Sequence, residues 1–173
     1  MKIGVIDTSF LIDWAKYSKR YLLSKVYDKI IMLSKILDEI KSEDTLIYIV
    51  SEMERQFFIY VDVTSQIENR AMEIINQSLK IKRVDLPEAL CIAYAEKFGY
   101  DVLTENMGAI RFPSFVKRVK AIDVLVEMYS GCLINDLKEE LENYMRETKH
   151  RYSDEEICRV ISTTRKRRSG QES

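Results

Sequence analysis

Short apolar runs alternate along the chain with stretches in which apolar residues recur every three or four positions. Residues 2–7 form the first run, which is rich in Ile and Val and ends in Asp7. Such a run is typical of a buried parallel strand. The runs at 46–50, 100–104 and 119–122 have the same character, so we expect four strands.

Helical periodicity fills the intervals between these runs. The spacing of apolar residues over 14–43 predicts one long amphipathic helix or two helices in tandem. Further helices are expected over 51–61, 68–79 and 124–129. Residues 85–98 are apolar on nearly all sides and stop at a glycine, which predicts a helix buried between other elements.

The order of these elements predicts an α/β fold. Strands separated by helices indicate a three-layer α/β/α sandwich with a mainly parallel central sheet, which we place at residues 1–131. Residues 132–164 show helical periodicity alone and are expected to form a C-terminal helical extension. We expect its apolar face to pack on the sheet domain, and the alternatives are a homodimer contact and the binding of a partner helix. Residues 165–173 are basic and lack periodicity, which predicts a mobile tail.

The composition is that of a globular chain and excludes several function classes. Of the 173 residues, 46% are hydrophobic and 32% charged, and the formal net charge of -1 leaves no global positive field for a general nucleic-acid binder. One histidine, three distant cysteines and five glycines leave no Ser-His-Asp site, zinc site or glycine-rich phosphate loop. Because there is no signal-peptide pattern and no apolar run long enough to span a bilayer, we expect a cytoplasmic protein without a membrane partner.

Carboxylates gather at one end of the predicted sheet. Asp7 ends the first strand and Glu105 follows the third, so both should lie at the carboxyl edge of the strands. Glu88 begins the helix that leads into the third strand and therefore starts at the same edge. In the helix predicted over the 50s, Glu54 shares the apolar stripe, so we select Glu54 and keep Glu52 as the alternative.

Each of these acids also has a purely structural interpretation. Asp7 is a favoured helix N-cap residue, and Glu88 lies at capping-box spacing from Asp85. A solvated helix position is the alternative for Glu54, and a turn position is the alternative for Glu105. The four acids at converging positions favour a shared site over four separate structural roles.

Three segments resemble the PIN-domain nuclease family, which includes the VapC-type toxins. Residues 6–12 (IDTSFLI) resemble the family's first strand and turn, residues 86–95 its acidic, alanine-rich helix, and residues 99–106 its third strand and loop. The resemblance covers roughly residues 1–130. At the last motif the family usually has Asp, where this chain has Asn106.

The resemblance implies a site for Mg²⁺ or Mn²⁺, because these ions prefer carboxylate and water oxygens to His or Cys. One or two ions would activate water for attack on a phosphodiester. The expected catalytic and metal-binding acids are Asp7, Glu54, Glu88 and Glu105. Asn106 is expected as a neutral oxygen ligand, Thr8 and Thr104 as supporting hydrogen-bonding residues, and Arg165, Lys166, Arg167 and Arg168 as contacts to RNA.

The function that the resemblance implies is that of a metal-dependent endoribonuclease that hydrolyses RNA, of the kind that acts as the toxin of a toxin–antitoxin pair. RNA, an antitoxin protein and a second copy of the chain are the expected partners. The alternative is a catalytically weakened PIN-like module that binds RNA or a protein partner, because Asn106 removes one charge. A phosphorelay receiver domain fits less well, since it needs an acidic pair after the first strand and only Asp7 is present.

Overall fold

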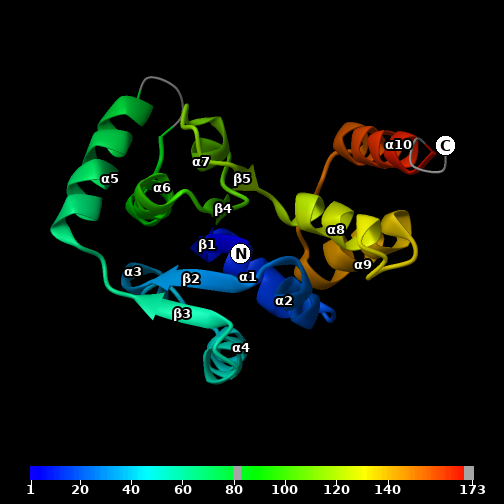
Figure 1. The fold of residues 1–173 in the computed structure, drawn as a ribbon, viewed down its shortest axis with the longest axis horizontal. Helices are drawn as coiled ribbons and strands as arrows, with labels where there is room; N and C mark the ends of the chain where they lie inside the picture. Colours follow the sequence, from blue (N-terminus) through cyan, green and yellow to red (C-terminus); the bar gives the residue numbers. More distant parts are fainter. Residues whose placement is uncertain (80–82, 170–173) are drawn as a thin grey trace.

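A parallel sheet lies at the centre of the chain in the computed structural model, which describes residues 1–79 and 83–169 (Figure 1). In these residues the sheet has five strands in the order β3-β2-β1-β4-β5, and every neighbouring pair is parallel. The strands are β1 (Ile3–Ile6), β2 (Lys29–Leu33), β3 (Phe58–Val61), β4 (Asp101–Leu103) and β5 (Arg118–Val119). The predicted α/β fold with a parallel central sheet is confirmed.

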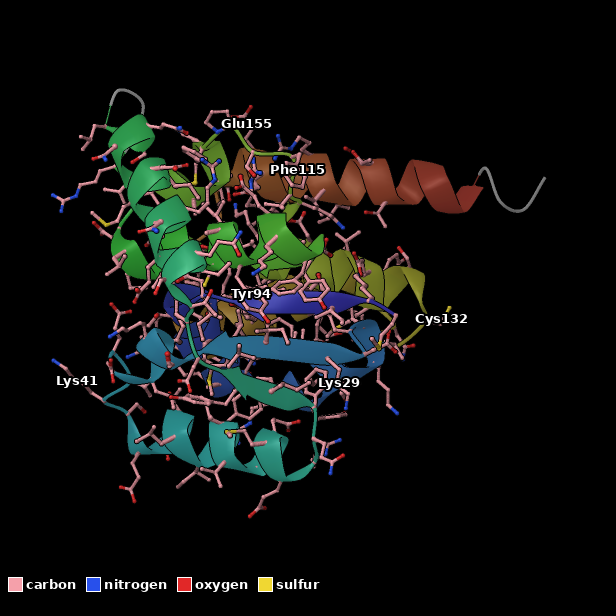
Figure 2. All side chains as sticks on the ribbon, turned by 60° about the vertical axis from the view of Figure 1, so that its left-hand side comes forward. Lys29, Lys41, Tyr94, Phe115, Cys132 and Glu155 are labelled. Carbon is pink, nitrogen blue, oxygen red and sulfur yellow. The ribbon has the colours of Figure 1, made fainter. Side chains whose placement is uncertain are left out.

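Helices connect the strands and lie on either side of the sheet (Figures 1 and 2). In the order of the chain they are α1 (Thr8–Lys16), η1 (Arg20–Leu22), α2 (Leu23–Val26), α3 (Ser34–Leu37), α4 (Glu43–Glu54), α5 (Ser65–Ser78), α6 (Leu86–Phe98), α7 (Met107–Arg111), α8 (Ala121–Ser130), α9 (Leu137–Thr148) and α10 (Asp154–Ser169). Among the described residues, no helix is long and apolar enough to cross a membrane.

The central strand β1 is apolar because helices cover both of its faces. Val5 and Ile6 have no exposed surface, as expected for a strand in the middle of a parallel sheet. Gly4 is needed at its position because a Cβ there would lie 2.3 Å from Leu103 Cδ1 on the neighbouring strand. This close packing holds β1 against β4, the strand from which part of the candidate site extends.

Three sequence predictions for residues 14–61 are wrong. The helix or helix pair expected over 14–43 contains strand β2, and the strand expected over 46–50 lies inside helix α4. The helix expected over 51–61 ends at Glu54, and its remaining residues include the edge strand β3. Apolar runs of four or five residues fit a buried strand and a helix face equally well, so periodicity alone does not separate them.

The later predictions agree better with the structure. Helices α5 and α6 and strand β4 lie where they are expected, and Gly99 ends α6 in the left-handed conformation with φ 72°. The fourth predicted strand is reduced to the two residues of β5, because Ala121 already begins α8.

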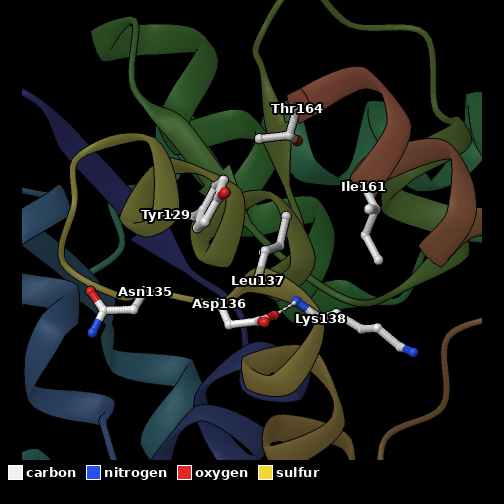
Figure 3. Close-up of a pocket in the computed structure, with 7 residues that line it drawn as sticks. All are labelled: Tyr129, Asn135, Asp136, Leu137, Lys138, Ile161 and Thr164. Atoms are coloured by element: carbon white, nitrogen blue, oxygen red, sulfur yellow. Dashed lines mark hydrogen bonds between the residues drawn. The ribbon is translucent and has the colours of Figure 1, made fainter. Parts of the chain in front are cut away.

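The C-terminal helices pack against the sheet domain. Leu137, Leu141 and Tyr144 of α9 are buried in the common core, where the Tyr144 ring lies 5.9 Å from that of Trp14 in α1. Helix α10 covers a cavity of about 100 Å³ next to α8 and the start of α9, and it extends away from the sheet (Figures 1 and 3). The backbone of α10 continues through residue 169, but the side chains of 165–169 and all of 170–173 lie outside the described part, so the mobile tail stays a prediction.

Candidate active site

Asp7 is the centre of a polar cluster at the carboxyl edge of the sheet. It directly follows β1, and only 2% of its surface is exposed. Its Oδ2 atom accepts hydrogen bonds from Ser9 Oγ at 2.6 Å and from Thr104 Oγ1 at 2.8 Å. Burial raises the pKa of Asp7 above its usual value, against the opposing effect of these hydrogen bonds. The carboxylate is therefore held in place while its charge is only partly compensated.

Glu88 lies near the start of α6, at the same edge of the sheet. Its Oε2 atom accepts a hydrogen bond from the Asp85 backbone N–H at 2.8 Å and completes a capping box, while Oε1 accepts one from Asn106 Nδ2. Burial raises the pKa of Glu88 to about 7, and the negative charge of Asp7 adds to the shift. Capping and membership of the acidic cluster are thus compatible roles.

Glu39 is the third acid at this edge, and the sequence interpretation misses it. Its exposed carboxylate accepts a hydrogen bond from Thr8 Oγ1 at 2.6 Å. The charge of Glu39 also contributes to the raised pKa values of Asp7 and Glu88. The interpretation places Glu39 inside one long helix, whereas β2 and α3 bring it to the carboxyl edge. An acid soon after a second strand is the signal that would have identified it.

Glu54 lies at the opposite edge of the sheet, so the structure does not bring it together with Asp7 and Glu88 as the prediction of a shared metal site requires. Glu54 is the last residue of α4, just before β3 begins. This part of the chain lies next to the start of β2, because Lys29 Nζ donates a hydrogen bond to the Gln56 carbonyl. Figure 2 shows Lys29 and Lys41 at the two ends of the sheet, with α4 running between them. Glu54 is exposed, and the alternative, Glu52, is buried beside Arg55 at the same distant edge.

Asn106 contributes a hydrogen-bond donor to the cluster. Its Oδ1 atom caps α7 by accepting a hydrogen bond from the Gly108 backbone N–H at 2.7 Å, which leaves the amide nitrogen to donate to Glu88. Its own backbone N–H donates to Thr104 Oγ1 at 3.0 Å. Asn106 therefore holds Glu88, and its oxygen does not face the acids as the predicted neutral ligand would.

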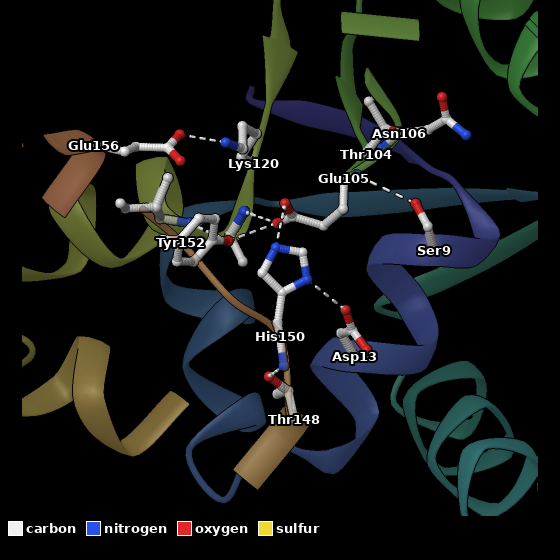
Figure 4. Close-up of polar contacts among 12 residues, drawn as sticks. Ser9, Asp13, Thr104, Glu105, Asn106, Lys120, Thr148, His150, Tyr152 and Glu156 are labelled. Atoms are coloured by element: carbon white, nitrogen blue, oxygen red, sulfur yellow. Dashed lines mark hydrogen bonds and ion pairs between the residues drawn. The ribbon is translucent and has the colours of Figure 1, made fainter. Parts of the chain in front are cut away.

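The Glu105 side chain points away from Asn106 and toward His150 and Tyr152 (Figure 4), so the structure does not place it as the predicted substitute metal ligand. Its Oε1 atom accepts hydrogen bonds from the Ala121 backbone N–H at 2.7 Å and from Tyr152 Oη at 2.8 Å. His150 Nε2 lies 3.3 Å from its Oε2 atom. Successive residues in extended chain point to opposite sides, so Glu105 cannot face the same way as Thr104 and Asn106.

The remaining donor set suits a hard divalent cation. Carboxylate and hydroxyl oxygens are the donors that Mg²⁺ and Mn²⁺ prefer. In the described part of the chain, the charged groups that act on Asp7 and Glu88 are other carboxylates. No group of three His, Cys, Asp or Glu side chains within 1–79 and 83–169 is arranged to hold an ion directly. Mg²⁺ is often bound through one or two carboxylates and several waters, so the pair Asp7 and Glu88 fits such an ion.

Among the solved structures that resemble this fold are two VapBC complexes and a toxin–antitoxin complex. DNA-bound VapBC from Salmonella typhimurium matches with a TM-score of 0.52 and 20% identity, over 69% of this chain and 98% of that chain. VapBC2 from Rickettsia felis, bound to a DNA fragment from its promoter, matches with a TM-score of 0.52 and 15% identity, over 68% of this chain and 98% of that chain. A toxin–antitoxin complex from Klebsiella pneumoniae matches with a TM-score of 0.51 and 15% identity, over 67% of this chain and 95% of that chain. At these identities the likeness shows the fold.

A search of curated proteins finds no match to the chain. The sequence does match a family model described as PIN domain, over residues 3–166. This match spans the sheet, the acidic edge and most of the C-terminal helices, which is nearly the whole chain. The chain therefore belongs to the PIN-domain family, whose members are typically nucleases.

Proposed function

We propose that the chain is a Mg²⁺- or Mn²⁺-dependent endoribonuclease that hydrolyses RNA phosphodiester bonds. The observation that carries the proposal is the pair Asp7 and Glu88, two buried acids with raised pKa values at the carboxyl edge of the sheet. Active sites are where burial and like charges commonly shift pKa values in this way. Membership of a family that generally uses divalent metal ions supports the same conclusion.

The residues of the cluster have distinct roles in this proposal. Asp7 and Glu88 hold the ion, and Glu39 adds a third negative charge next to them. When bound, the ion supplies activation of a water molecule and offsets charge on the leaving oxygen. Thr104 orients Asp7 through its hydroxyl group, and Asn106 orients Glu88 through its amide nitrogen.

Matched Glu→Gln substitutions test this assignment. Calorimetric titration should detect Mn²⁺ binding to the wild-type protein and none to Asp7→Asn. Cleavage of single-stranded RNA in Mn²⁺ should fall strongly in Asp7→Asn and Glu39→Gln. The control is Glu54→Gln, which should cleave like the wild type because Glu54 lies at the other edge. Cleavage that persists in EDTA or in Asp7→Asn would refute the metal site.

We further propose that the chain is the toxin of a toxin–antitoxin pair. The similar structures of VapBC and of a toxin–antitoxin complex support this at the level of the fold. Leu46, Ile47 and Val50 give α4 an exposed apolar face of the kind that a protein partner covers. Induced production of the wild-type chain should arrest bacterial growth, and production of Asp7→Asn should not. Equal arrest by both would contradict the proposal, while sedimentation would distinguish a homodimer from a monomer.

RNA contact by Arg165, Lys166, Arg167 and Arg168 remains part of the proposal, although these side chains lie outside the described part of the chain. Their support is their charge, because phosphate contacts release counterions and make binding depend on salt. Replacing the four by Ser should weaken RNA binding and flatten its salt dependence. Unchanged salt dependence would show that the phosphate contacts lie elsewhere.

The second candidate is a PIN-domain module that binds RNA or a protein but has little catalytic activity. The observation that favours it is Asn106, which presents an amide where the family usually has a carboxylate, while Glu105 faces away. Under this alternative, wild-type protein binds RNA in Mn²⁺ without cleaving it. Asn106→Asp would then be the substitution that restores metal binding.

A further inference from the structure

Glu105 belongs to a second buried polar cluster, which connects the sheet to the segment between α9 and α10. Its side chain is 4% exposed, and within the described residues its Oε2 atom makes no hydrogen bond. Its Oε1 atom meets the backbone N–H of Ala121 at the start of α8, where a negative charge is favourable. The metal site described above uses none of these groups.

Two residues of the α9–α10 segment enclose the Glu105 carboxylate (Figure 4). Tyr152 Oη donates to Glu105 Oε1 at 2.8 Å and accepts a hydrogen bond from the Ile122 backbone N–H at 3.2 Å. The His150 ring lies between two acids, with Nδ1 3.0 Å from Asp13 Oδ2 and Nε2 3.3 Å from Glu105 Oε2. The contact with Asp13 is the main reason that the pKa of His150 is raised, and the charge of Glu105 adds to it, which favours the doubly protonated ring.

Glu105 also sits between the two residues that orient the acidic pair. Thr104 donates to Asp7, and Asn106 donates to Glu88. The backbone N–H of Glu105 itself donates to Ser9 Oγ at 3.2 Å, and Ser9 in turn donates to Asp7. Holding the Glu105 side chain on one side of the loop therefore fixes Thr104 and Asn106 on the other.

From this arrangement we infer that His150 and Tyr152 are positioning residues, which hold the β4–α7 loop so that Thr104 and Asn106 face Asp7 and Glu88. The inference rests on the proposed metal site, which gives the held loop its purpose. It assigns to the C-terminal extension a part in shaping the active site, through a single residue, Glu105.

Amide hydrogen exchange of the metal-free protein tests the inference directly. Tyr152→Phe keeps the ring and removes the hydroxyl group, and His150→Ala removes the imidazole. In both variants the amides of Glu105, Asn106 and Gly108 should exchange about tenfold faster than in the wild type, the effect of losing one or two hydrogen bonds on local opening. Exchange in α5 and α6 should stay unchanged.

Tyr17→Phe is the matched control, because it also removes a buried tyrosine hydroxyl group between the sheet domain and the extension. Tyr17 Oη donates to Glu140 in α9 at 2.5 Å and does not contact the β4–α7 loop. In Tyr17→Phe the amides of residues 104–108 should exchange at the wild-type rate. Unchanged exchange in both Tyr152→Phe and His150→Ala, or equal acceleration in Tyr17→Phe, would overturn the inference.

Mn²⁺ affinity gives the second readout and separates the two proposals. Tyr152→Phe should weaken Mn²⁺ binding by about tenfold, the usual cost of removing a residue that supports a metal ligand. If the wild type binds no Mn²⁺ while the loop exchange responds, the proposed function fails and the positioning role stands. If the wild type binds Mn²⁺ and both variants match it in Mn²⁺ affinity and amide exchange, the positioning role fails and the proposed metal site stands.

Discussion

Replacing Glu88 by Gln should make the metal-free protein more stable at pH 8, although it removes a native charge. Burial and the neighbouring acids raise the pKa of Glu88 from 4.5 to about 7 in the folded chain. Between these values the unfolded chain has released the proton and the folded chain still holds it. The contribution of Glu88 to wild-type stability therefore falls as the pH rises from about 4.5 to about 7.

The size of the effect follows from the pKa shift. At pH 8, above both values, the ionised Glu88 costs the folded state about 3 kcal/mol, whereas at pH 5 the cost is about 1 kcal/mol. Gln keeps one acceptor oxygen, so either Asp85 or Asn106 loses its hydrogen bond, at about 1 kcal/mol. Glu88→Gln should therefore be nearly neutral at pH 5 and more stable than the wild type by about 2 kcal/mol at pH 8.

Urea unfolding in EDTA at the two pH values measures this difference. Glu96→Gln is the control on the same helix. Although burial acts to raise it, the pKa of Glu96 is lowered by hydrogen bonds from Arg70 and Ser114, so its stabilising charge is present at both pH values. A Glu88→Gln effect that is the same at pH 5 and pH 8 would refute the reasoning. Adding Mn²⁺ at pH 8 should favour the wild type and reverse the order.

Further predictions concern single residues. Asn106→Asp should lower metal-free stability, because a carboxylate replaces the hydrogen-bond donor to Glu88, and it should raise Mn²⁺ affinity by supplying a hard ligand. Thermal melting with and without Mn²⁺ measures both effects, and a variant that melts like the wild type in both conditions would contradict the prediction. Gly4→Ala should cost about 1–3 kcal/mol in urea unfolding, because the new Cβ overpacks against Leu103. A thiol reagent should label the exposed Cys132 and Cys158 in the native protein but reach Cys91, which is fully buried, only after unfolding. Cys91 of α6 lies against the Ile6 carbonyl of β1, so rapid native labelling of all three thiols would show that α6 does not pack on β1.

The order of strands and helices can be predicted from the sequence where the two kinds of element have different sequence patterns. Strand β4 is preceded by a glycine cap and followed by polar residues, so its limits are clear. Strand β2 has no such boundary, because the four apolar residues after Lys29 fit the stripe of a helix as well as a buried strand. Helix α4 has a continuous apolar run over 46–50, because apolar residues lie on its exposed face as well as on its buried face. Such a run has the sequence pattern of a buried strand.

The position of an acid can be predicted only where the elements that carry it can be predicted. Asp7 and Glu88 depend only on β1, α6 and β4, which the sequence predicts. Glu39 depends on β2, so its position is lost with that strand. The direction of Glu105 could have been inferred from alternation, since Thr104 is the residue that faces Asp7, but the partners His150 and Tyr152 come from a distant segment that no local pattern connects to it.

The place of β1 in the middle of the sheet has a consequence for synthesis of the chain. A ribosome makes β1 first, and β4, its neighbour on one side, belongs to a segment made much later. Asp7 and Thr104 are 97 residues apart, which at usual rates of synthesis is a delay of about 5 to 20 seconds. During that time the growing chain can pair β1 with β2 and β2 with β3, but the other edge of β1 stays open. Strand β4 therefore does two things when it is made. It covers the open edge of β1, which could otherwise aggregate, and it brings Thr104 to the Asp7 carboxylate.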